Sequence, residues 1–170
     1  MKKQSFIYLL MSIVIGISLS CSSDDDNNIN SEQYLNASVN GSEFLSDENM
    51  APLGFKRILT PSGRINLQAK AISAEGNIIE IFIDNYVGAG KYYFGKDIYS
   101  QSWVSYQSPL RTEAWRIHPG EALNLQSNFI EISSITDNFL EGKIGCRELI
   151  SGLPDNFGEM DGEFRLFLFE

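Results

Sequence analysis

The chain has 170 residues, a length typical of one domain or of one domain with small additions. It contains 22 acidic residues against 13 lysines and arginines, which gives a formal net charge of −9 at pH 7. Because an acidic chain repels phosphate backbones and no basic patch offsets the charge, we expect no nucleic-acid partner.

The N-terminus has the pattern of an export signal. Lys2 and Lys3 precede an uncharged, apolar run over residues 6–19. That run is shorter than the ~20 residues that a helix needs to span a bilayer core. The basic start, the short apolar core and the small residues that follow predict a signal peptide over residues 1–20. The alternative is a permanent membrane-anchor helix.

Residues 18–21, Ser-Leu-Ser-Cys, resemble the lipobox of bacterial lipoproteins. Ser18 stands where that pattern commonly has leucine, as in the looser form found in Bacteroidetes. The resemblance implies that Cys21 is lipidated and carries acyl chains such as palmitate. Several chains hold a protein stably on a membrane, because each buried CH₂ contributes about 0.8 kcal/mol. The alternative is an ordinary cleaved signal followed by an incidental cysteine.

Residues 21–33 are polar and acidic, and Ile29 is their one aliphatic side chain. Such a segment cannot bury enough apolar surface to fold, so we expect a flexible tether. Its start resembles the acidic export signal of surface-exposed Bacteroidetes lipoproteins, through Ser22, Ser23, Asp24, Asp25 and Asp26. The resemblance implies display on the outer face of the outer membrane. A plain solvated linker on a protein that faces the periplasm is the alternative.

Residues 34–170 have the pattern of a single all-β domain. Asn40-Gly41 between two extended runs is a strong hairpin signal, because both turn positions favour a positive φ. Gly142 and Gly145 indicate bulges or bends within one strand. Ten candidate strands cover residues 34–39, 42–45, 64–73, 78–84, 91–94, 102–106, 113–117, 128–136, 139–149 and 160–169. This spacing, without a convincing helical period, predicts an antiparallel β-sandwich or a small barrel-like meander of about ten short strands.

Four stretches carry a family resemblance: Ala37-Ser38-Val39-Asn40-Gly41, Gly90-Lys91-Tyr92-Tyr93-Phe94, residues 130–144 and residues 160–166. Over most of the mature chain, this layout resembles a family of small, uncharacterised all-β Bacteroidetes outer-membrane lipoproteins. Such relatives usually have an aromatic residue where this chain has Gly145-Cys146. The resemblance implies an all-β fold and an outer-membrane location, and it implies no activity and no functional residue.

One histidine and two cysteines limit the possible chemistry. Because Cys21 is assigned to lipid, Cys146 and His118 remain, and they cannot form a His/Cys zinc site. Period-two alternation places Cys146 on one face with Leu140 and Ile144, so we expect a buried, inert thiol. No nucleophile elbow and no glycine-rich phosphate loop is present.

The carboxylates do not single out a site either. Asp155, Asn156 and Asp161 match no spaced calcium loop, and turn chemistry is the better account of them. No pair of acidic residues is selected for glycoside hydrolysis, which leaves a glycoside hydrolase-like enzyme as a weaker alternative. We therefore expect no enzymatic activity, no metal and no cofactor.

Aromatic residues crowd the segment between residues 86 and 115, which holds eight where the chain average of 12% gives about four. Tyrosine and tryptophan combine an apolar body with a polar edge and therefore suit exposed binding surfaces. The predicted platform consists of Tyr86, Tyr92, Tyr93, Tyr99, Trp103, Tyr106 and Trp115. The alternative is that these residues, with Phe94, fill and rim a β core.

Together these patterns predict a lipid-anchored, non-enzymatic binding or accessory domain of the cell envelope. Its partners would be the membrane, through the lipid on Cys21, and a glycan or an envelope protein at the aromatic platform. The alternative is a structural envelope component or assembly partner with no small ligand.

Overall fold

The computed structural model describes residues 33–96, 99, 101–110, 112–151 and 157–169, all within the unit Glu32–Glu170. The predicted signal peptide, Cys21 and the acidic export signal lie outside the described residues. Of the predicted tether, Gln33 is described, and its Oε1 accepts a hydrogen bond from the Phe167 N–H at 2.8 Å.

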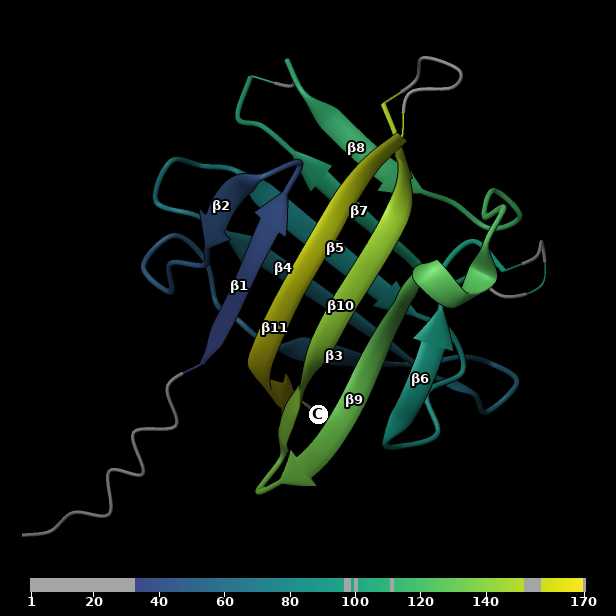
Figure 1. Ribbon diagram of the computed structural model, residues 1–170. Helices are drawn as coiled ribbons and strands as arrows, with labels where there is room; N and C mark the ends of the chain where they lie inside the picture. The colour runs from purple at the N-terminus through teal and green to yellow at the C-terminus, as the bar shows by residue number, and fades with distance from the viewer. Residues whose placement is uncertain (1–32, 97–98, 100, 111, 152–156, 170) are drawn as a thin grey trace, which may run out of the picture. The chain divides into compact units, whose positions relative to one another are not determined.

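The unit is built from β-strands, which confirms the all-β prediction (Figure 1). The described residues form a single sheet of eleven strands, together with one 3-10 turn, η1, at Leu125–Ser127. The strands are β1 Tyr34–Val39, β2 Ser42–Leu45, β3 Phe55–Leu59, β4 Ile65–Ile72, β5 Ile78–Ile83, β6 Gly90–Tyr93, β7 Trp103–Gln107, β8 Ala114–Ile117, β9 Phe129–Thr136, β10 Phe139–Ile150 and β11 Phe157–Phe169.

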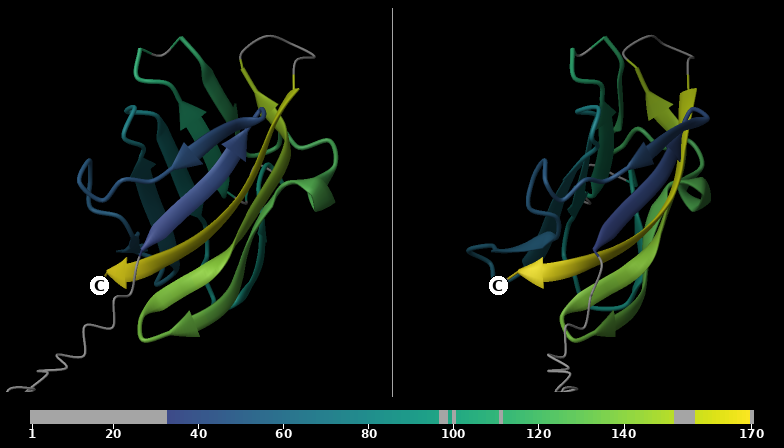
Figure 2. Two further views of the ribbon diagram at one scale, coloured as in Figure 1. Left: turned by 60° about the vertical axis from the view of Figure 1, so that its left-hand side comes forward. Right: turned by 90° about the vertical axis from the view of Figure 1, so that its left-hand side faces the viewer.

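The sheet folds over itself into two layers whose strands cross (Figures 1 and 2). The front layer contains β2, β1, β11, β10, β9 and β6, and the back layer contains β3, β4, β5, β7 and β8. At one corner β11 pairs with β3, and at the other β10 pairs with β8 through Ile150 and Arg116. Because β10 also pairs with β11, the ring is closed, and β2 and β6 are left as sheet edges.

The core lies between the layers, and strand alternation fills it. Ile79, Ile81 and Ile83 of β5 are fully buried, while Glu80 and Phe82 point to the other face. Larger side chains from both layers pack against them, including the edge-to-face pair of Phe55 and Phe164. The prediction that Cys146 is buried with Leu140 and Ile144 is confirmed.

Turns and bulges fall where their residue types permit. Asn40 and Gly41 have φ values of 51° and 81°, which confirms the predicted hairpin turn. In β9 an extra residue, Ser133, faces the step between Glu141 and Gly142. A Cβ on Gly142 would overlap the Glu131 carbonyl oxygen, so this position requires glycine. The predicted irregularity at Gly142 is therefore confirmed.

Two features of the sheet differ from the sequence prediction. Strand β3 was not among the ten candidates, because its burial does not alternate along the strand. Its pairing with β11 is parallel, through Leu168 with Phe55 and Phe169 with Lys56, whereas every other pairing is antiparallel among the described strands. This short parallel contact closes one corner of the barrel-like sandwich.

Candidate functional site

The predicted aromatic platform does not form one surface. Tyr106 is 7% exposed and Phe94 is fully buried, so both belong to the core and the placement of Tyr106 on a platform is wrong. Trp115 shares the inward face of β8 with Ile117 and packs against the core, and its Nε1 donates to Glu113 Oε1 at 2.6 Å. Tyr106, Phe94 and Trp115 therefore support the fold, and Tyr106 and Trp115 also border a surface hollow.

Tyr86 and Tyr92 close another part of the core. Their ring centroids are 6.0 Å apart, and both residues pack on the core cluster. The Tyr92 hydroxyl donates to the Gly88 carbonyl at 2.6 Å and accepts from the Val87 N–H at 3.1 Å. Burial raises the pKa of Tyr86, with a smaller contribution from Tyr92. This pair therefore organises the loop between β5 and β6.

Trp103 is the predicted platform residue whose ring lies on the outer face of the back layer. It pairs directly across strands with Phe82, and the two rings stack with centroids 6.0 Å apart and planes 12° apart. Phe82 on β5 thus covers one side of the indole, and Trp103 also lines a hollow together with residues of β8. Sequence reasoning missed Phe82, because the pairing of β5 with β7 was not known.

A hollow of about 230 Å³ lies beside Trp103, and we call it the Trp103 hollow. Most of its side chains come from the outward positions of three adjacent strands, which alternation brings to one face, while Tyr106 and Trp115 border it from the core side. It is lined by Glu80, Trp103, Ser105, Tyr106, Gln107, Ala114, Trp115, Arg116 and His118. An aromatic side chain is thus surrounded by hydroxyl, amide, carboxylate, guanidinium and imidazole groups that can form hydrogen bonds.

A second hollow, of about 440 Å³, is rich in cations and is called the cationic hollow. It is lined by Arg64, Asp84, Asn85, Lys91, Tyr92, Tyr93, Lys96, Tyr99 and Ser102. Tyr93, Tyr99 and Tyr92 of the predicted platform therefore meet here, away from Trp115. The Tyr93 hydroxyl donates to Gln126 Oε1 at 3.2 Å, which links the hollow to the turn η1.

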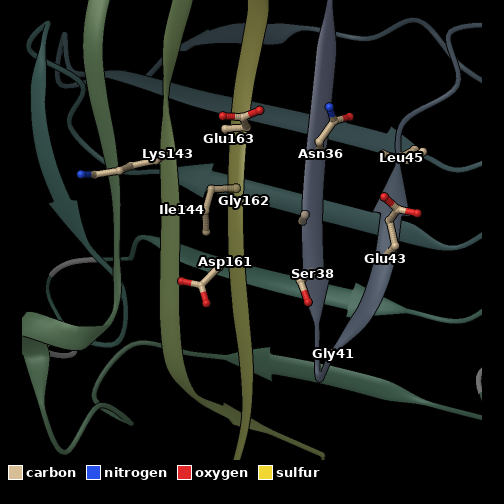
Figure 3. A pocket seen from close by; sticks show the side chains of 11 residues that line it. Asn36, Ser38, Gly41, Glu43, Leu45, Lys143, Ile144, Asp161, Gly162 and Glu163 are labelled. Atoms are coloured by element: carbon tan, nitrogen blue, oxygen red, sulfur yellow. The ribbon is translucent and has the colours of Figure 1, made fainter.

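A larger groove of about 600 Å³ lies on the outer face of the front layer (Figure 3). Its side chains come from β1, β2, β10 and β11 and include Asn36, Ser38, Glu43, Lys143 and Asp161, with no aromatic residue among the lining. Two of its charges are already neutralised, because Asp161 pairs with Arg147 at 2.7 Å and Lys143 pairs with Glu131 at 3.4 Å. The groove thus has no aromatic ring for stacking, although it is larger than the Trp103 hollow and includes the exposed side chain of Leu45.

The buried thiol is inert. Burial, the dominant cause, raises the pKa of Cys146 to about 12. Its Sγ donates to Asn128 Oδ1 at 3.1 Å, so the thiol is a protonated hydrogen-bond donor at neutral pH.

Within the part of the chain that the structure describes, no three His, Cys, Asp or Glu side chains converge on a possible metal site. Nor do those residues include a helix long and apolar enough to cross a membrane.

A buried polar network holds the turn η1, whose Gln126 accepts the hydrogen bond from Tyr93 of the cationic hollow. Asn128 is fully buried, and its Oδ1 also accepts from the Arg147 and Glu148 N–H groups at 3.0 and 3.2 Å. Its Nδ2 donates to the Asn124 carbonyl and to Glu148 Oε2, and the Glu148 carboxylate also accepts from the Leu123 and Asn124 N–H groups. The network ties η1 to Arg147 and Glu148 of β10, where the register with β11 shifts between Cys146 and Leu149. Sequence reasoning did not detect it.

Similarity to known proteins does not identify this site: no protein-family model, no curated protein and no solved structure matches the chain. The resemblance to Bacteroidetes lipoproteins therefore stays a prediction. Function has to be inferred from the chemistry of the hollows.

Proposed function

We propose that this protein is a lipid-anchored, non-enzymatic binding domain of the bacterial outer membrane, and that it binds a glycan at the Trp103 hollow. The observation that supports the proposal is the position of Trp103. Its indole is supported on one side by Phe82 and borders a hollow rimmed with hydrogen-bonding side chains.

This arrangement matches the two-sided chemistry of a sugar ring. The C–H groups of a pyranose form an apolar face that packs on an aromatic ring, while its hydroxyls need donors and acceptors at the rim. Ser105, Gln107 and Arg116 provide both kinds of group beside Trp103. Phe82 holds the indole in place, so little side-chain freedom remains to be lost on binding.

The dimensions favour a glycan over an enclosed small molecule. At about 230 Å³ the hollow is smaller than the ~300–1,000 Å³ typical of drug-sized pockets, so it suits one ring of a longer ligand. A protein partner would be expected to use a wider apolar patch. Glu80 is the one carboxylate among the described residues of the lining, whereas glycoside hydrolysis commonly uses two. Binding without hydrolysis is therefore the better account.

The test is a glycan array, followed by calorimetric titration of the best ligand with the full-length protein in detergent micelles. Trp103→Ala should weaken binding at least tenfold, since truncating a central aromatic anchor commonly costs 2 kcal/mol or more. Phe157→Ala removes an exposed aromatic residue of β11, outside the lining of the hollow, and should leave affinity unchanged. Equal affinities of wild type and Trp103→Ala, or no glycan bound by the wild type, would contradict the proposal.

The envelope location rests on the N-terminal pattern and is tested separately. Cys21→Ser should abolish lipid attachment and release the protein from the membrane fraction. Protease treatment of intact cells distinguishes surface display, in which the tether is cut, from the periplasmic alternative, in which it survives until lysis. If Cys21→Ser remains membrane-bound with unchanged processing, the lipid anchor is wrong.

A further inference from the structure

The cationic hollow has more positive than negative side chains, whereas the chain as a whole is acidic. Three of its lining residues are cations, Arg64, Lys91 and Lys96, and Asp84 is the one carboxylate among the described lining residues. The whole chain has a net charge of −9, so a local excess of positive charge is not expected from composition.

Two of these cations have no counter-ion in the part of the chain that the structure describes. Outside this hollow, four of the seven described lysines and arginines form ion pairs: Lys70 with Glu80, Lys143 with Glu131, Arg147 with Asp161 and Arg165 with Glu141. Arg64 and Lys96, like Lys56, Arg57 and Arg116, form no ion pair with any described carboxylate, and Arg64 and Lys96 line the same hollow. Converging cations without partners in a hollow attract an anionic group, because their electrostatic potentials add there.

The third cation is held in place. Lys91 Nζ lies 4.1 Å from the centre of the Phe129 ring and 3.7 Å from Glu131 Oε2. Tyr93, which also lines this hollow and is two residues from Lys91 on β6, is bonded to Gln126. One wall of the hollow is therefore organised before any ligand arrives, which lowers the entropy lost on binding.

The cationic hollow and the Trp103 hollow both include residues of β5 and its continuation. Asp84 lines the first and Glu80 lines the second; they share the outward parity of the strand and are four residues apart, or about 13 Å at 3.3 Å per residue. The Asp84 N–H donates to Ser102 Oγ at 3.0 Å, which fixes this junction. A ligand of a few sugar units can thus reach from one hollow into the other.

We propose that the ligand is an acidic oligosaccharide, one of whose units stacks on Trp103 while a carboxylate or sulfate of another lies in the cationic hollow between Arg64 and Lys96, beside the Glu131-paired Lys91. This inference rests on the proposed function and adds the class of glycan. Arg64 supplies a planar guanidinium that can bind either anion through two parallel hydrogen bonds, and the lysines supply point charges.

The experiment compares neutral, carboxylated and sulfated glycans on one array, with full-length protein in detergent micelles. The best acidic ligand is then titrated beside a form whose carboxylates are methyl-esterified or whose sulfates are removed, which separates the two anions. Wild type should bind the acidic form at least tenfold more tightly than its neutral counterpart, and added salt should reduce the difference.

Arg64→Gln combined with Lys96→Gln should bring the affinity for the acidic form down to that for the neutral form. The matched control, Lys56→Gln with Arg57→Gln, removes the same charge at two residues outside the lining of both hollows and should keep the preference. Binding that depends on Trp103 but shows no acidic preference would overturn this inference and leave the proposed function standing. Absence of any glycan binding by the wild type would overturn both.

Discussion

Replacing Asn128 with alanine should destabilise the domain by about 3–5 kcal/mol. The substitution removes an amide that is fully buried and forms five hydrogen bonds. It leaves the Arg147 and Glu148 N–H groups and the Asn124 carbonyl without this partner. Each unsatisfied buried group costs ~1–3 kcal/mol, and the lower part of that range applies because Arg147 and Glu148 lie near solvent.

Urea unfolding followed by tryptophan fluorescence measures this loss as a lower midpoint at constant m-value. Asn49→Ala is the matched control, because the Asn49 side chain bonds Asp47 on an exposed loop and should change stability by no more than about 0.5 kcal/mol. A loss below about 1 kcal/mol for Asn128→Ala would refute the reasoning, since it would mean that water replaces the amide at little cost.

Two further predictions concern the core. Gly142→Ala should cost about 3 kcal/mol or more in urea unfolding, because its Cβ would overlap the Glu131 carbonyl oxygen; a change below 1 kcal/mol would contradict this steric argument. Cys146 should resist thiol reagents at pH 8 in the folded state and react after unfolding, because its pKa is raised from 9.0 to about 12. This raised pKa contributes stability that is present below pH 9 and is lost as the pH rises toward about 12, and Cys146→Ala should lack that part of the pH dependence.

The strands and the first hairpin could be predicted because their signals are local. Alternation of Ile79, Ile81 and Ile83 identifies a buried strand face without knowledge of its neighbours. Asn40-Gly41 specifies its turn locally, because both residues tolerate the positive φ that a two-residue hairpin turn requires. Strand β3 could not be predicted in this way, because its burial does not alternate and one of its two partners, β11, is distant in sequence.

The aromatic platform was partly wrong for a related reason. A count of aromatic residues ignores parity, although Trp103 and Tyr106 are three positions apart on one strand and so must face opposite sides. Alternation alone could have separated them. The stacking of Phe82 on Trp103 and the convergence of Arg64, Lys91 and Lys96 could not be found, since both depend on which strands become neighbours.

The distribution of charge favours the back layer and the adjoining cationic hollow as the binding region. On the outer face of the front layer, cross-strand partners satisfy one another: Glu131 lies between Lys91 and Lys143, and Arg147 binds Asp161. Such ladders fix register and solubility, and a ligand would have to break them. On the back layer, Arg116 has no carboxylate partner among the described residues and lies beside a half-buried Trp103. Charges and rings that the fold itself does not use are the groups that remain available to a ligand.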